Sequence, residues 1–142
     1  MDSRKKQYKK EENVVEKVNK PLTLQYKDAK KLYLEDGFAY KKANEMKGIK
    51  SHQLRKVLNS IKEASTIVKN DPIRFEDAKN ILFYIVPMTA YNAGREKSVR
   101  PLYDFVSSHI NENTITNIDD IKMLDKLFTS IVAYHKLLNP RN

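Results

Sequence analysis

Histidine side chains can bind metal ions, and their spacing in this 142-residue sequence shows whether they match a known metal-binding motif. They are His52, His109 and His135, and the chain contains no cysteine. Protein zinc sites draw on histidine, cysteine or carboxylate ligands at short fixed spacings, and HExxH does not occur. His135 falls on an apolar stripe, where a histidine is more often a packed core residue than a ligand. The sequence therefore predicts no metal site and no cofactor.

The other polar motifs lack the context that catalysis requires. The segment 94–98 (GREKS) resembles the end of a phosphate-binding loop, but the second glycine and a preceding strand are missing. No serine lies in a nucleophile-elbow motif. The adjacent acidic pairs at 11–12 and 119–120 fall in a tail and at a helix start. We predict that the protein is not an enzyme. A small basic nuclease remains as an alternative, because such enzymes use dispersed His and Lys catalysts.

Basic side chains dominate the charge, with 27 Lys and Arg against 18 Asp and Glu and a net charge of +9. They gather in two blocks, whose candidate binding residues are Lys47, Lys50, His52, Arg55 and Lys56, then Arg95, Lys97 and Arg100. Clustered cations can neutralise successive phosphates and release counterions. The same residues also fit a solvated helix face. No motif here reads bases, so we expect contacts to the nucleic-acid backbone.

The chain has eight tyrosines, which offer a second route to nucleic acid through stacking on unpaired bases. Most of them fall within predicted helices, where core packing is the more common use. Tyr26, Tyr40 and Tyr103 are the candidates for stacking.

The elements that position these residues are predicted to be helices, because three glycines are too few for the regular turns of a strand-rich fold. Apolar residues at helical spacing predict helices over about 28–47, 51–69, 75–93, 99–110 and 117–138. Ser51 is the expected N-cap of the second helix, and Thr116 or Asn117 that of the last.

Glycine and proline mark the expected breaks in these helices. Gly37 is expected to bend or break the first helix, and Gly48 to end it as a C′ residue. The third helix is apolar around much of its circumference, which predicts that it is the central helix of the bundle. Pro87 is expected to kink or divide that helix, and Gly94 to end it.

The predicted fold class is all-α, a compact bundle of about five helices with a flexible basic N-terminal tail. We assign residues 1–20 to the tail, which either stays mobile or forms a helix only against a partner, and residues 21–142 to a single domain. The sequence shows no signal peptide and no apolar run of the roughly 20 residues that span a membrane. We expect a soluble protein of the cytoplasm.

Three segments taken together carry a family pattern: 49–58 (IKSHQLRKVL), 86–96 (VPMTAYNAGRE) and 128–136 (FTSIVAYHK). In motif, order and separation they resemble the small subunit of type III-A CRISPR effector complexes, the Csm complexes, over about residues 35–138. Two departures stand out. His52 replaces the more usual second hydroxyl residue, and Val86 stands where an arginine is common.

This resemblance implies an all-α subunit present in several copies, stacked head to tail as an inner filament beside the guide RNA and its target RNA. The implied partners are those two RNAs, further copies of the chain, a large polymerase-like subunit and a repeated backbone subunit. Cleavage belongs to other subunits in that family. The implied role of this chain is to hold the guide–target duplex through phosphates and to help couple pairing to activation in antiviral defence.

The family motifs also assign roles to particular residues. The resemblance places RNA contacts at Lys50, Arg55 and Lys56 in the first segment and at Arg95 in the second. Lys47, Lys97 and Arg100 flank these positions and rest on charge alone. In the third segment, Tyr134 and His135 are expected to pack internally, and Lys136 to face RNA or a neighbouring subunit.

Other functions stay open beside this one. A protein-interaction adaptor would use the basic face against an acidic protein. The small subunit of a type III-B complex shares the fold class, and a soluble basic protein with no polyanionic partner has the same composition.

Overall fold

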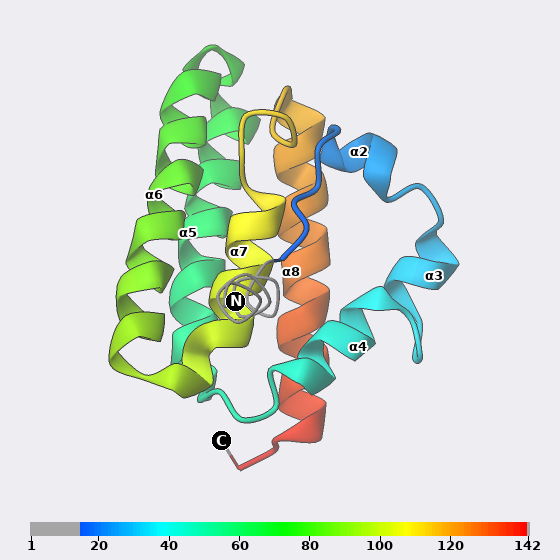
Figure 1. Cartoon of the computed structure of the whole chain (residues 1–142). Coiled ribbons are helices and arrows are strands. Elements are labelled where there is room, and N and C mark those ends of the chain that lie inside the picture. Colours follow the sequence, from blue (N-terminus) through cyan, green and yellow to red (C-terminus); the bar gives the residue numbers. More distant parts are fainter. Residues whose placement is uncertain (1–14, 142) are drawn as a thin grey trace, which may run out of the picture.

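The computed structural model describes residues 15–141, and every regular element in that range is a helix (Figure 1). Five of these α-helices have eight residues or more. The elements are α2 (Leu22–Gln25), α3 (Ala29–Tyr33), α4 (Phe38–Glu45), α5 (Ser51–Asn70), η1 (Pro72–Arg74), α6 (Phe75–Arg95), η2 (Lys97–Val99), α7 (Arg100–His109) and α8 (Ile118–Leu138). The predicted all-α bundle of about five helices is confirmed. None of the described helices is long and apolar enough to cross a membrane.

Helix α8 lies at the centre of the arrangement, packed against α4 and α5 and also touching α2 and α3 (Figure 1). Its inner side chains are fully buried, and they are Ile121, Leu124, Leu127, Phe128 and Ile131. Burying one such side chain stabilises a fold by about 1.5–3 kcal/mol. The apolar stripe that the sequence predicted for this helix is therefore the main wall of the core.

The prediction that α6 is the central helix is wrong. Helix α6 packs against α5 and α7 but lies at the edge of the bundle (Figure 1). Tyr84, Met88 and Tyr91 on its outer side are 66%, 46% and 66% exposed. Its apolar circumference therefore reflects exposed apolar side chains rather than burial on all sides. The helix continues through Pro87 without dividing and includes Gly94 before it ends at Arg95.

Helix α5 buries the predicted stripe, with Leu54, Val57, Ile61, Ser65 and Val68 all in the core. Its start differs from the prediction by one residue. Lys50 occupies the N-cap position with extended backbone, and Ser51 is the first helical residue. The N-cap preference for serine is a tendency worth about 1 kcal/mol, which tertiary packing overrides.

The predicted first helix is broken into α3 and α4 at Gly37, as expected. Asp36 takes a positive φ of 71°, and Gly37 follows as the N-cap of α4. A Cβ atom at Gly37 would lie 2.6 Å from the Lys31 carbonyl oxygen and 2.8 Å from that of Leu34. Only glycine fits this close approach of backbone to backbone. The predicted C′ role of Gly48 is wrong, because α4 already ends at Glu45 and no glycine of residues 15–141 has a positive φ.

The last helix begins with the expected cap. The Asn117 side chain accepts the Asp120 backbone N–H at 3.1 Å, and the Asp120 side chain accepts the Asn117 N–H at 3.2 Å. This reciprocal pair is a capping box, which satisfies two amides that have no partner inside the helix.

Residues 15–20, which composition assigned to the tail, run along α7. The Val18 N–H donates to the Ser108 carbonyl oxygen at 2.9 Å, and the Asn111 side-chain amide donates to the Val18 carbonyl oxygen at 3.0 Å. Composition cannot show backbone hydrogen bonds of this kind, because they do not depend on the side chains of the bound segment. The rest of the predicted tail, residues 1–14, lies outside the described residues.

Candidate nucleic-acid interface

The fold brings the two basic blocks to the same end of the bundle (Figure 1). Helices α5 and α6 form an antiparallel pair, so the start of α5 lies beside the end of α6. All eight candidate side chains are exposed. Lys47 and Lys50 lie in the α4–α5 connection, His52, Arg55 and Lys56 in the first turns of α5, Arg95 at the end of α6, Lys97 in η2 and Arg100 at the start of α7. We call this surface the basic end.

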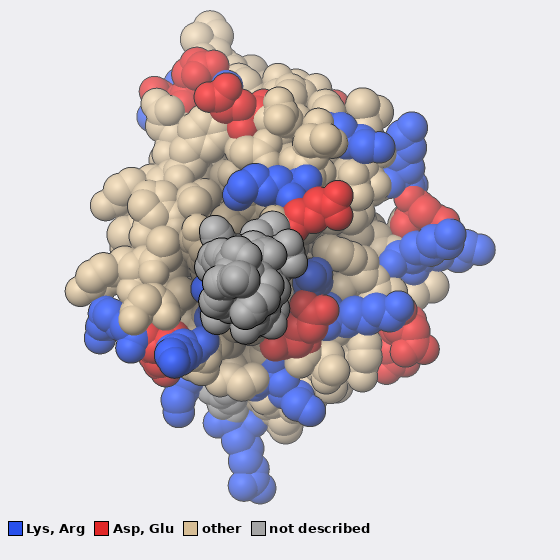
Figure 2. All heavy atoms as spheres, in the orientation of Figure 1, with Lys and Arg blue, Asp and Glu red and all other residues tan. Residues whose placement is uncertain are grey.

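One side-chain hydrogen bond joins α6 to α5 near the basic end. The Asn92 side-chain amide donates to the Gln53 side-chain oxygen at 3.4 Å, across the space between α6 and α5. Figure 2 shows lysine and arginine side chains projecting along the lower edge of the molecule, where these connections lie, and acidic side chains at its upper left. Asp71, Glu76 and Asp77 belong to the opposite end of the α5–α6 pair. Arg74 pairs with Asp77 at 3.0 Å and Lys79 with Glu76 at 3.5 Å, so that end is close to neutral and the excess of positive charge lies at the basic end.

The start of α5 favours anions because its first turn contains no acidic residue. The backbone amides of a helix start carry a partial positive charge, which α8 balances with Asp119 and Asp120 and which α5 leaves unbalanced. Arg55 and Lys56 lie on different sides of α5. Arg55 borders a depression of about 340 Å³ beside α8, and Lys56 lines a groove beside α6.

Arg95 and Arg100 of the second block differ in how strongly other side chains of the protein bind their guanidinium groups. The Arg95 guanidinium lies 5.6 Å from the centre of the exposed Tyr91 ring. Arg100 Nε donates to Asp104 Oδ1 at 2.9 Å, so its charge is partly neutralised inside the protein. Arg95 is therefore the stronger candidate of the two for binding phosphate.

The histidines divide into one exposed and two buried residues. His52 is exposed on α5, and His135 is buried, as expected, with Nε2 donating to the Ile49 carbonyl oxygen at 2.9 Å. That bond holds the chain just before α5, so His135 helps to position Lys50 without touching solvent. His109 is buried among aromatic rings. Within residues 15–141 no cluster of three or more His, Asp or Glu side chains could hold a metal ion.

Two of the tyrosines proposed for base stacking are used for packing instead. Tyr26 packs on Phe38 with ring centres 5.1 Å apart and its hydroxyl bonds to His109. Tyr40 meets Tyr134 edge to face at 5.3 Å. Tyr103 is half-buried beneath Arg100. These contacts give all three rings partners inside the protein.

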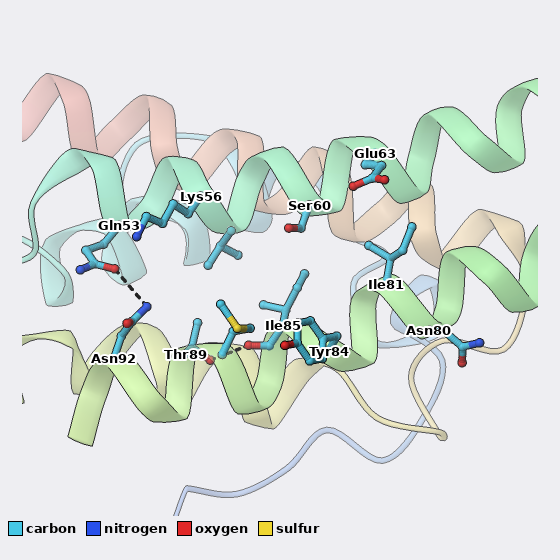
Figure 3. Close-up of a pocket in the computed structure, with 12 residues that line it drawn as sticks. Gln53, Lys56, Ser60, Glu63, Asn80, Ile81, Tyr84, Ile85, Thr89 and Asn92 are labelled. Atoms are coloured by element: carbon cyan, nitrogen blue, oxygen red, sulfur yellow. Dashed lines mark hydrogen bonds between the residues drawn. The ribbon is translucent and has the colours of Figure 1, made fainter. Parts of the chain in front are cut away.

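A groove of about 540 Å³ runs between α5 and α6 (Figure 3). Val57, Ile81 and Ile85 contribute apolar surface to it, and Lys56 and Asn92 line it toward the basic end. The residues that face it from α6 include the exposed Tyr84 and Met88. The apolar spacing of α6 does not reveal this surface, because the same spacing predicts a buried helix.

Comparison with known proteins decides the family. A family model described as Csm2 Type III-A matches residues 27–141. The chain belongs to this family. It is a small subunit of the type III-A CRISPR effector, the Csm complex. No curated protein and no solved structure matches the chain.

The family match covers the elements from α3 to α8 and leaves out α2. All three motif segments lie within it, and the structure explains why they occur together. The first segment starts α5, the second ends α6, and the third contributes Tyr134 and His135 of α8. The Tyr134 hydroxyl donates to the Tyr33 carbonyl oxygen at 2.6 Å. In the third segment, His135 supports the basic end from inside and Tyr134 holds the end of α3 against α8. The first two segments form the surface of the basic end.

Proposed function

We propose that this Csm2-family chain is a non-catalytic subunit that holds guide and target RNA through phosphates at its basic end. In this proposal several copies stack head to tail as an inner filament of the complex, which acts in antiviral defence in the cytoplasm. Guide RNA, target RNA, the large polymerase-like subunit and the repeated backbone subunit are its partners. Membership of the Csm2 family supports the assembly, and the structure supports the place of RNA contact.

The observation that carries the RNA proposal is the convergence of two basic blocks that are about 40 residues apart in the sequence. Exposed cations from α5, α6 and η2 lie at the same end of the bundle, where they could contact successive phosphates. Side chains such as Arg55 and Lys56 reach outward on flexible stems and can follow an irregular backbone. We therefore expect little sequence preference, because phosphate contacts fix position without reading bases.

The direct test compares two double charge reversals in the full chain. R55E/K56E removes cations from the basic end, and K30E/K31E makes the same change in net charge on α3, away from that end. We expect R55E/K56E to weaken binding of a guide–target RNA duplex about tenfold or more, measured by fluorescence anisotropy. K30E/K31E should change the affinity about twofold or less. Circular dichroism checks that both variants keep their helices.

Other outcomes of this comparison assign other functions. Equal losses in the two variants would mean that net charge alone attracts RNA and would contradict a binding surface at the basic end. Weak binding by the wild type, together with incorporation of the protein into the complex, would support the adaptor function instead.

The non-catalytic part of the proposal has its own measurement. Purified protein is incubated with labelled RNA, and we expect the RNA to stay intact. Cleavage that survives purification and disappears in H52A would support the nuclease alternative, because His52 is exposed whereas His109 and His135 are buried. The filament is tested by native mass spectrometry of the purified complex, which should contain more than one copy of this chain.

A further inference from the structure

The outer face of α6 has the spacing of a helix that packs against another helix. Ile81, Tyr84, Met88 and Tyr91 follow one another at intervals of three, four and three residues. This is the a/d pattern of paired helices. Tyr84, Met88 and Tyr91 remain exposed, and Ile81 is half-buried. Ile81, Tyr84 and Met88 also form the α6 wall of the α5–α6 groove. Nothing in residues 15–141 covers this face.

The same face is self-complementary about Val86. Residues at equal distances before and after Val86 carry side chains that can pair with one another. In an antiparallel pair related by a two-fold axis, residue i of one copy faces residue j of the other, and j faces i. The pairs about this level are Asp77 with Arg95, Asn80 with Asn92, Ile81 with Tyr91, and Tyr84 with Met88. They match acid to base, amide to amide and apolar to apolar. Each element of the pattern is thus satisfied by a second copy of the same helix.

We propose that two copies of the free chain associate through α6 in an antiparallel, two-fold symmetric dimer. This inference rests on α6 alone and does not depend on RNA binding. In the dimer, Tyr91 of the second copy lies against Ile81, at the edge of the groove in Figure 3. The Tyr84 rings and the Met88 side chains of the two copies form the apolar centre of the contact.

Charge selects the antiparallel orientation over the parallel one. The first turn of α6 is acidic, through Glu76 and Asp77, and its last turn carries Arg95. A parallel pair would bring two basic ends together on chains of net charge +9. An antiparallel pair separates positions 95 of the two copies by about 27 Å along the axis, well beyond the Debye length of about 8 Å. It also places each Arg95 beside Asp77 of the second copy.

Both charged partners already have contacts within one chain. Asp77 accepts a hydrogen bond from Arg74 Nε at 3.0 Å, and its side chain is still 59% exposed. Arg95 lies over its own Tyr91. A carboxylate can accept further donors, so Asp77 can take Arg95 of the second copy without releasing Arg74. The ion pairs then set the orientation, and the apolar centre supplies most of the affinity.

A contact built on one exposed helix face is small. Interfaces below about 1,200 Å² are typical of weak, transient association. We therefore expect a dissociation constant of roughly 1–100 µM rather than a permanent dimer. Dimer and monomer should exchange over the concentrations used in ordinary solution measurements.

Sedimentation velocity of the full chain over a concentration series tests the association. The wild type should shift from monomer to dimer as concentration rises. M88D should raise the dissociation constant at least tenfold, because it places a carboxylate in the apolar centre. The matched control is L24D, since Leu24 on α2 is 51% exposed against 46% for Met88 and lies off the face. L24D should dimerise like the wild type.

Cysteine cross-linking tests the orientation, because the native chain has no cysteine. D77C mixed with R95C should form a cross-linked pair with a short reagent, and neither variant alone should cross-link. The charge swap D77R/R95D should dimerise better than either single substitution, since each copy then restores both pairs.

Three results would overturn the proposal. A wild type that stays monomeric at all concentrations would contradict the association. Cross-linking of D77C to itself would mean a parallel pair and would contradict the orientation. A monomeric wild type whose RNA affinity falls in M88D would instead assign this face to RNA.

Discussion

Asp120 is fully buried, yet its carboxylate keeps its charge because five donors surround it. Oδ1 accepts the Thr23 N–H and hydroxyl at 3.0 and 2.9 Å. Oδ2 accepts the Thr116 N–H and hydroxyl at 2.8 and 2.7 Å, besides the Asn117 N–H. Burial by itself raises the pKa of Asp120, but these hydrogen bonds outweigh burial and leave the pKa below its ordinary value. One side chain thus joins α2 to the start of α8.

His109 shows the opposite balance, because its surroundings favour the neutral ring. Burial lowers its pKa to about 4, a hydrogen bond to Phe105 opposes the change, and the nearby Lys42 charge adds to it. Nδ1 lies 3.0 Å from the Phe105 carbonyl oxygen, which only accepts, so Nδ1 carries the proton. Nε2 then accepts the Tyr26 hydroxyl. The sequence does not reveal this site, because Tyr26, which follows α2, is 83 residues from His109 in the chain.

The lowered pKa of His109 predicts an acid-dependent loss of stability. The unfolded histidine binds a proton near pH 6.5 and the folded one near pH 4. Between these values the unfolded state holds more protons, so the free energy of unfolding falls as pH falls. The loss from this group should reach about 3 kcal/mol at pH 4. Urea unfolding at several pH values measures it.

Two histidine variants identify the group responsible. H109Q removes the titrating ring, so it should flatten the pH dependence between pH 6.5 and 4, although packing on Phe105 is also lost. H52Q changes an exposed histidine and should keep the wild-type dependence. An unchanged slope in H109Q would assign the acid sensitivity to other groups.

Helices with one clear apolar stripe could be predicted from the sequence. Helix ends that depend on tertiary contacts could be predicted less well. The stripes of α5 and α8 and the Asn117 cap of α8 follow from local spacing and side-chain chemistry. The start of α5 does not, because Lys50 is placed there by tertiary contacts such as the bond from His135 to Ile49. The role of α6 was mistaken, because periodicity cannot distinguish an apolar face that is buried from one that is exposed.

Two glycine substitutions should change stability in opposite directions. G37A introduces a Cβ that meets two backbone carbonyl oxygens, so it should lower the free energy of unfolding by about 2 kcal/mol. G94A adds a Cβ in open space within α6 and should raise it by about 0.5–1 kcal/mol. Thermal or urea unfolding compares the two with the wild type. Equal effects would mean that the break before α4 tolerates a side chain.

In the whole molecule, the candidate site depends on an arrangement that no local pattern contains. Both basic blocks were evident in the sequence, but their meeting requires the antiparallel pairing of α5 with α6. The excess of cations at this end over the other end of the α5–α6 pair, where Arg74 and Lys79 pair with Asp77 and Glu76, also appears only in the fold. The exposed face of α6 was missed for the same reason, since exposure is a property of the assembled bundle.

This charge distribution predicts a measurable salt dependence when the probe is single-stranded RNA. Each phosphate contact with a single strand contributes about 0.7 to the slope of log affinity against log salt. Contacts from Lys50, Arg55, Lys56 and Arg95 would give a slope of about 3 in magnitude, and R55E/K56E should reduce it by about 1.5. Anisotropy titrations at several salt concentrations measure both slopes. K30E/K31E should keep the wild-type slope, and an equal reduction there would contradict the assignment.

The central place of α8 also bears on how the protein is made. Its inner face packs against α4 and α5, and α2 is tied to Asp120 at its start, so the core closes around a helix that follows all its packing partners in the sequence. A nascent chain that stops before residue 118 has the walls of the core but not its centre. Domains fold as units during synthesis, so productive folding waits for the C-terminal segment to leave the ribosome. We expect chains that lack α8 to expose the apolar faces of α4 and α5, which makes them substrates for proteases.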